Sequence, residues 1–115
     1  MVVEKLLKEK RAREKYFRNY YQYAKEIKEI ARKYFKENLH EVFVFGSVLE
    51  DYHVMLSDID IAIVLKEDVS WKEKILFKVE ISKKFKSNPF EIHVIPLNAW
   101  RFYLNFIKSK YRRVS

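Results

Sequence analysis

Apolar residues recur at helical spacing through the first third of the chain, and this pattern predicts a helix over residues 3–37. Asn38 is well suited to a left-handed stop at its end. Within the helix, residues 16–23 are aromatic on several sides, so we expect them to pack against more than one core face. The recurring positions are Ala24, Ile27, Ile30, Ala31 and Tyr34.

Three runs of β-forming residues follow, and they predict strands over 41–45, 59–65 and 90–95. A capping-box pattern at Ser70 predicts a helix from there to about Phe85, along which Leu76 and Val79 recur at helical spacing. Asn98 is placed to cap a last helix. The expected apolar stripe of that helix is Trp100, Tyr103, Leu104, Ile107 and Tyr111.

The order helix, strand, strand, helix, strand, helix indicates a small α/β (α+β) fold. We find no internal repeat and no low-complexity linker, and we expect one domain over residues 1–115. Its predicted parts are an N-terminal helical segment over 1–38, a core over 39–97 and a C-terminal helix over 98–113. With 49% hydrophobic and 17% aromatic residues, the chain has enough apolar material for a folded core.

No apolar run approaches the roughly 20 residues that a membrane-spanning helix needs. The N-terminus lacks the pattern of a secretory signal, and the chain has no cysteine. We therefore expect a cytoplasmic protein that does not enter a membrane.

Charge is distributed unevenly. Residues 1–38 hold twelve Lys and Arg against six Asp and Glu, and residues 101–115 hold five Lys and Arg and no acid. Since the whole chain carries +8, the segment between these ends is net acidic. The basic ends are either ordinary solvated helix faces or surfaces that attract a polyanion such as RNA or an acidic partner protein. Neither interpretation explains the acids in the middle.

Two of these acids begin the second predicted strand. Because side chains alternate across a strand, Asp58 and Asp60 are expected on one face, about 7 Å apart, opposite a buried row of Ile residues. Two neighbouring carboxylates repel each other, and bound cations relieve that repulsion. Oxygen ligands of this kind suit Mg²⁺ or Mn²⁺. Taken alone, the pattern also fits a wet strand end with no ligand.

The chain contains a single glycine, Gly46, directly after the first predicted strand. Average usage would give roughly eight glycines in this length. We infer that Gly46 is needed there, either for a sharp turn or for the close approach of a phosphate. Ser47 offers a hydroxyl and an N–H to such an anion.

Glu91 lies on the third predicted strand, and it shares a strand face with His93. If this strand is the neighbour of the second, Glu91 joins the aspartates as a third acid. Three converging acids can hold two metal ions and support in-line phosphoryl-type displacement. Glu91 could instead be a general base for an attacking hydroxyl, or merely the outward residue of an edge strand.

Taken together, these segments resemble the signature of the polymerase-beta-type nucleotidyltransferase superfamily, and in particular its minimal nucleotidyltransferases. The resemblance spans about residues 39–97. The residues that carry it are Phe45-Gly46-Ser47, Ser57-Asp58-Ile59-Asp60-Ile61 and Phe90-Glu91-Ile92-His93.

The resemblance implies a small mixed sheet flanked by helices. It implies that Gly46, Ser47 and Ser57 bind the nucleotide, usually as its triphosphate. It also implies that Asp58 and Asp60 bind Mg²⁺, with Glu91 as the third carboxylate. The chemistry usual in this superfamily is transfer of a nucleoside monophosphate, commonly AMP from ATP, to an acceptor hydroxyl, with pyrophosphate leaving.

One departure concerns the loop after Ser47. Many members of the superfamily carry an Arg-Gly pair there, whereas this chain has Val48-Leu49-Glu50-Asp51. The missing cation favours an alternative: a catalytically weak module that binds a nucleotide or a partner. A basic RNA-binding subunit is a third hypothesis.

The chain shows no obvious acceptor-binding domain, so we expect self-association or a second polypeptide. The resemblance implies a small helical HEPN partner in a toxin–antitoxin pair, with this chain as the antitoxin. Residues 16–23 are the candidate interface, unless they pack on the chain's own sheet.

Overall fold

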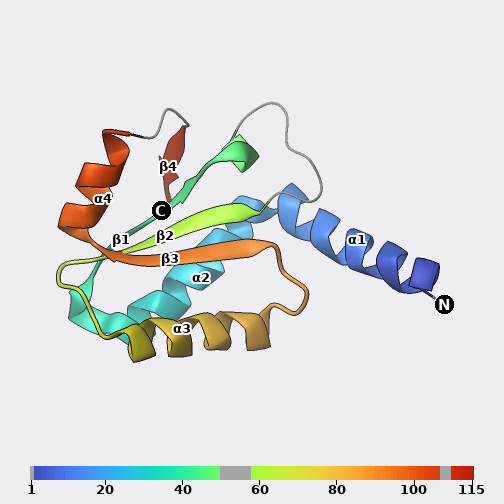
Figure 1. Ribbon diagram of the computed structural model, residues 1–115, viewed down its shortest axis with the longest axis horizontal. Helices are drawn as coiled ribbons and strands as arrows, with labels where there is room; N and C mark the ends of the chain where they lie inside the picture. Colours follow the sequence, from blue (N-terminus) through green and yellow to red (C-terminus); the bar gives the residue numbers. More distant parts are fainter. Residues whose placement is uncertain (1, 50–57, 107–109) are drawn as a thin grey trace.

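The computed structural model describes residues 2–49, 58–106 and 110–115, and its elements are shown in Figure 1. They form a mixed α+β fold, which confirms the predicted fold class. In chain order the elements are α1 (Val2–Arg18), α2 (Tyr20–Phe35), the 3₁₀ turn η1 (Lys36–Asn38), β1 (Leu39–Phe45), the 3₁₀ turn η2 (Ser47–Leu49), β2 (Ile59–Leu65), α3 (Trp71–Lys84), β3 (Phe90–Pro96), α4 (Leu97–Leu104) and β4 (Tyr111–Arg113). In the described part of the chain, no helix is long and apolar enough to cross a bilayer.

The described strands form one mixed sheet in the order β3-β2-β1-β4. β2 runs parallel to β3 and antiparallel to β1, and β1 pairs antiparallel with β4. In this register Asp60 on β2 lies beside Phe45 of β1 on one side and beside Glu91 of β3 on the other. β2 is therefore the strand that brings the three predicted motifs together.

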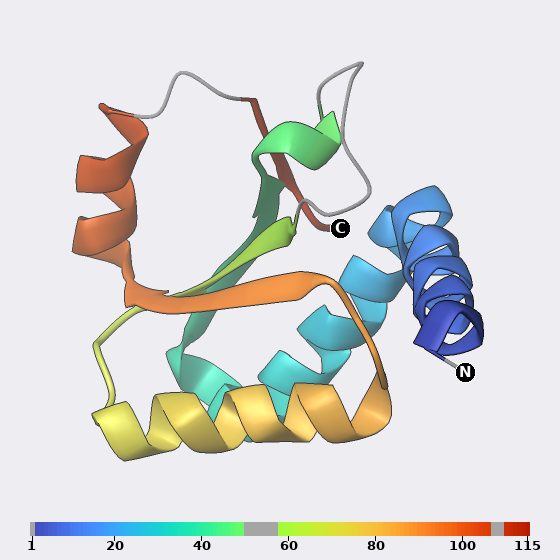
Figure 2. The same ribbon diagram turned by 45° about the vertical axis from the view of Figure 1, so that its right-hand side comes forward.

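Both faces of β2 are buried, which explains its nearly continuous apolar sequence. Ile59, Ile61 and Ile63 pack into the larger core, which lies on the side of the sheet that α2 and α3 cover (Figure 2). Ala62 and Val64 point the other way, into a smaller core with Phe45 and Trp100 beneath α4. Because α4 is short, it covers only one end of this second face. The other end carries Asp60 and Glu91.

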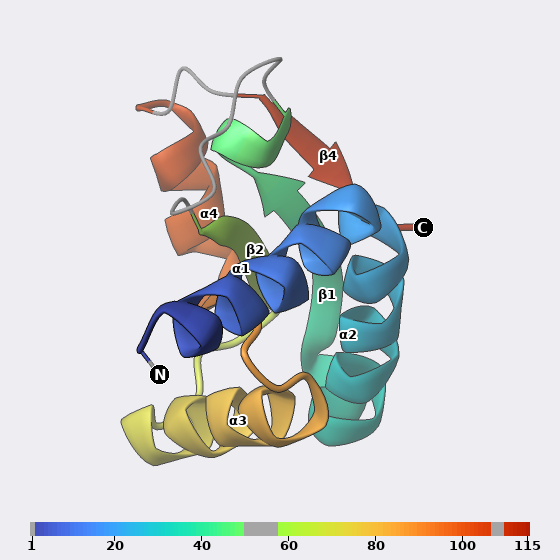
Figure 3. The same cartoon turned by 90° about the vertical axis from the view of Figure 1, so that its right-hand side faces the viewer.

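The predicted helix over residues 3–37 is wrong in one respect: it is two helices that meet at Asn19 (Figure 3). The Asn19 side chain and its own backbone N–H both donate to the Lys15 carbonyl at 3.1 Å, and the φ of −116° and ψ of 30° at Asn19 depart from helical values. The predicted left-handed stop at Asn38 is wrong as well, because the positive φ of 53° belongs to Lys36. Asn38 instead exchanges two 2.9 Å hydrogen bonds with the backbone of Glu67.

Helix α3 begins as predicted, with Ser70 Oγ accepting from the Glu73 N–H at 3.2 Å. Its inward face is not the one that Leu76 and Val79 indicate, because both side chains are exposed. Phe77 and Ile81 are buried in their place.

The predicted C-terminal helix is present, but its predicted extent over 98–113 is wrong. α4 starts directly after Pro96, one residue before Asn98, and it ends at Leu104. Asn98 is therefore not the N-cap residue, although its Oδ1 accepts from the first-turn Ala99 N–H at 2.9 Å. Tyr111 lies in β4, while Ile107 lies outside the described residues. The pairing of β4 covers the outer edge of β1, whose backbone groups would otherwise lack partners.

The aromatic segment over 16–23 packs on its own chain. Tyr16 is buried, and its hydroxyl donates to the Lys86 carbonyl at 2.9 Å. Its ring and that of Tyr23 contact Phe85 and Phe90. Burial, together with the neighbouring Tyr23, raises the pKa of Tyr16. This packing supports the second of the two interpretations offered for the segment.

Candidate active site

A group of three side chains lies where β2 and β3 run side by side. Asp60 and Glu91 are register partners, so their side chains leave the same face of the sheet. His93 follows two residues after Glu91, and its Nε2 lies 3.1 Å from Asp60 Oδ1 and 3.9 Å from Glu91 Oε1. One potential ligand atom from each of the three lies within 4.8 Å of the others. The condition under which Glu91 joins the aspartates, that β3 is the neighbour of β2, is thus met for Asp60.

Asp58 stands apart from this group. It precedes β2, its side chain is exposed, and its Oδ1 lies 4.0 Å from Nη2 of Arg13 on α1. At that separation and exposure the pair contributes little to stability. The structure therefore groups Asp60 with Glu91 and His93, and it leaves Asp58 outside this group, facing the Arg13 guanidinium. Nothing in the sequence pattern linked Arg13 to this site.

The sequence predicts that His93 and Glu91 share one face of their strand, but it does not assign His93 to the site. The strand alternation places His93 beside Glu91, but it does not show that His93 contacts Asp60. Only the pairing of β2 with β3 shows that the imidazole reaches Asp60.

The backbone conformation and the surroundings of position 46 both require glycine there. The φ of Gly46 is +88°, a conformation that residues with a side chain rarely adopt, so the predicted sharp turn is confirmed. A Cβ at this position would lie 2.5 Å from Asp60 Oδ2. The space that a side chain would fill is therefore occupied by the carboxylate of Asp60.

Ser47 begins η2 and is partly buried. The Gly46 N–H donates to the carbonyl of Lys110 at 3.3 Å, which leaves the predicted phosphate contacts to Ser47. The predicted nucleotide contact Ser57 lies outside the described residues, as do Glu50 and Asp51.

Residues 25–111 match the family described as "Polymerase beta, Nucleotidyltransferase". This chain belongs to the polymerase-beta-type nucleotidyltransferases. The match includes Gly46, Ser47, Asp58, Asp60 and Glu91, and the minimal type is consistent with it.

Two crystal structures, each described as that of a "putative nucleotidyltransferase", are similar to this nucleotidyltransferase. The first is 44% identical, covers 79% of this chain and 96% of its own, and superposes with a TM-score of 0.61. The second, from Sulfolobus solfataricus, is 23% identical, covers 81% of this chain and 77% of its own, and has a TM-score of 0.54. It supports the fold alone. A search of curated proteins returned no match.

The three-residue group of this nucleotidyltransferase fits a divalent cation. Two carboxylates supply the hard oxygen donors that Mg²⁺ and Mn²⁺ prefer, whereas an imidazole is more typical of Zn, Cu, Fe and Ni sites. The Asp60 side chain is 25% exposed, and those of Glu91 and His93 are more open, so water and substrate can reach them. The donors are close enough to share an ion and open enough to admit a phosphate.

Proposed function

We propose that this chain is a nucleotidyltransferase that uses Mg²⁺ or Mn²⁺ to transfer a nucleoside monophosphate, AMP from ATP, to an acceptor hydroxyl. The observation that carries this proposal is the placement of Asp60 between Gly46 and Glu91, at the end of the sheet that α4 does not cover. One strand thereby brings a turn suited to phosphate next to a pair of acids. Family membership supports the same reaction class.

In this reaction the acceptor oxygen forms a bond to the α-phosphorus of the nucleotide. The bond between that phosphorus and the oxygen bridging to the β-phosphate breaks, and its electrons leave with pyrophosphate. The hydroxyl proton passes to a carboxylate of the site or to water. Such a displacement needs positioned groups and charge neutralisation more than it needs a protein nucleophile.

Asp60 and Glu91 would hold the cation, and Asp58, two residues before Asp60, would complete the acidic set. When bound, the cation would neutralise charge on the phosphates and on the leaving group. Ser47 would orient the phosphates through its N–H and hydroxyl. His93 holds the Asp60 carboxylate in place through their 3.1 Å contact. Glu91, with its more open side chain, is also placed to accept the acceptor's proton.

The test is transfer of label from α-labelled ATP in the presence of Mg²⁺, together with calorimetric binding of MgATP. Asp60→Asn and Glu91→Gln keep side-chain size, and each should lower transfer by at least about 100-fold. Glu80→Gln, on the exposed surface of α3, is the matched control and should leave transfer unchanged.

Equal MgATP binding by the wild type and an Asp58→Ala/Asp60→Ala variant would contradict the proposal, as would no binding by either. RNA affinity that falls with salt and ignores the double substitution would favour the RNA-binding alternative instead.

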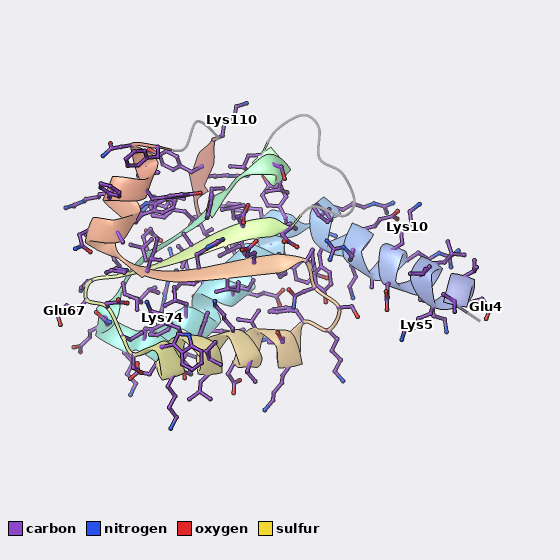
Figure 4. All side chains as sticks on the ribbon, in the orientation of Figure 1. Glu4, Lys5, Lys10, Glu67, Lys74 and Lys110 are labelled. Carbon is purple, nitrogen blue, oxygen red and sulfur yellow. The ribbon has the colours of Figure 1, made fainter. Side chains whose placement is uncertain are left out.

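The acceptor is proposed to be a second protein, of the small helical HEPN kind, in a toxin–antitoxin pair. Support comes from α1, which projects from the body of the domain (Figure 1) and carries exposed Val2, Val3, Leu6 and Leu7. In Figure 4, Glu4, Lys5 and Lys10 mark the charged surface of the same helix. An exposed apolar stripe beside charges is typical of a partner surface.

The test repeats the label transfer with the protein encoded beside this gene, using the wild type and a Leu6→Ser/Leu7→Ser variant. We expect label on the neighbour protein with the wild type and a loss of that label with the variant. Autonomous transfer to water or to small hydroxyl compounds should be equal in both. Absence of label on the neighbour, in a preparation that binds MgATP, would contradict the choice of acceptor.

A further inference from the structure

An aromatic pocket of about 430 Å³ lies between α4 and the strands β1 and β3. Its principal walls are Phe45, His93, Trp100, Phe102, Tyr103 and Phe106. Trp100 is only 2% exposed and contacts Phe45 edge-to-face, with ring centroids 5.5 Å apart. The volume is within the range typical of small-molecule sites, which are mostly apolar with a few polar groups.

The rim of this pocket is exposed in a way that ordinary packing does not explain. Phe102, in α4, is 66% exposed and Phe106, just after the end of α4, is 65% exposed, yet their ring centroids lie only 4.9 Å apart. Tyr103, between them in sequence, faces Phe45 with ring centroids 5.8 Å apart. Three neighbouring aromatic rings thus meet solvent around one hollow.

The pocket shares two of its walls with the site of the proposed reaction. Phe45 directly precedes Gly46, and its ring centroid lies 5.3 Å from that of His93. The Nε2 atom of His93 also lies 3.1 Å from Asp60 Oδ1. A ligand in the pocket would therefore lie next to both the predicted phosphate turn and the carboxylates.

We propose that this pocket binds the base of the nucleoside triphosphate. The inference rests on the proposed function, and it adds where the nucleotide is gripped and by which chemistry. Every base has a flat π-face that stacks on aromatic rings, whatever its hydrogen-bonding edge. The principal walls offer few polar side-chain groups, so stacking area, and not edge recognition, should set the preference. We therefore expect purine nucleotides to bind more tightly than pyrimidine nucleotides.

The experiment compares Mg²⁺-ATP with Mg²⁺-tripolyphosphate, which has the phosphates without the base. Binding of each is measured by calorimetry for the wild type, Phe102→Ala and Phe106→Ala. Trp71→Ala is the matched control, because Trp71 is an aromatic residue 78% exposed at the start of α3 and outside the pocket. Since Phe102 and Phe106 are largely exposed, both variants should fold.

For the wild type, ATP should bind at least about tenfold more tightly than tripolyphosphate. Each rim variant should weaken ATP by about tenfold and leave tripolyphosphate unchanged. Trp71→Ala should alter neither ligand.

Other outcomes separate the two proposals. If the wild type binds ATP no better than tripolyphosphate, the base pocket is refuted while the phosphate and metal site stands. If it binds neither, the proposed function fails and the pocket proposal fails with it. If the rim variants keep full ATP affinity and lose transfer only to a protein acceptor, the pocket is a partner surface and the base proposal is refuted.

Discussion

Replacing the single glycine, Gly46→Ala, tests the geometry that links β1 to the carboxylates. A residue with a side chain at φ +88° carries strain of about 1–3 kcal/mol. The new Cβ would lie 2.5 Å from Asp60 Oδ2, so the carboxylate must turn away. That movement breaks its 3.1 Å contact with His93, a loss of about 0.5–1.5 kcal/mol. We expect a total destabilisation of about 1.5–4.5 kcal/mol, which a domain of ordinary stability survives.

The assay is urea unfolding followed by circular dichroism, combined with a double-mutant cycle through Asp60→Ala. Removing the carboxylate removes the steric part of the penalty and leaves the backbone strain. Gly46→Ala should therefore cost about 1 kcal/mol less in the Asp60→Ala background than in the wild type. In the wild-type background it should also weaken binding of MgATP, because Asp60 is displaced.

Equal costs in the two backgrounds would refute the contact between position 46 and Asp60. A cost below about 0.5 kcal/mol would refute the backbone argument as well, since it is the range of a neutral surface change.

Three further predictions test the rest of the fold, with Leu76→Ala as a control. Glu41→Gln should destabilise the fold by about 1.5–3 kcal/mol at pH 7, because Lys28 Nζ donates to Glu41 Oε1 at 2.6 Å. Burial raises the pKa of Glu41, but the bond from Lys28 and further contacts outweigh it and hold that pKa below its usual value. This stabilisation is therefore present above the unfolded pKa and is lost as pH falls through the folded one, so urea unfolding should show the variant's deficit shrinking in acid. Ser70→Ala removes the cap of α3 and should cost about 1 kcal/mol in the same assay. Phe77→Ala should cost about 3–5 kcal/mol in thermal or urea unfolding, whereas Leu76→Ala should stay within about 0.5 kcal/mol, and equal costs would contradict the assigned face of α3.

Local pattern was enough to predict the three longer strands, because each is a compact run of β-forming residues with a defined end. It was also enough to identify Gly46 as a special backbone position, since one glycine in 115 residues stands where a strand stops. The alternation of Glu91 and His93 likewise follows from the strand period alone.

Other features depend on segments far apart in the sequence. The residues around Tyr111 continue an apolar helical stripe in the sequence, yet they form β4 because β1 offers an open edge for pairing. Leu76 and Val79 follow the helical period as well as Phe77 and Ile81 do, and only contact with α2 and the sheet decides which pair is buried. A periodic pattern identifies a helix more readily than it identifies the side that faces the core.

The single glycine shows where the two levels divide. The sequence by itself determined that position 46 needs a residue without a side chain, and that acids follow on the next strand. The tertiary structure alone decided that the Asp60 carboxylate fills the space beside Gly46, that His93 holds that carboxylate and that Asp58 faces Arg13. The physical reason is that backbone conformation and strand alternation are local, whereas the partner of a side chain is set by strand pairing between distant segments.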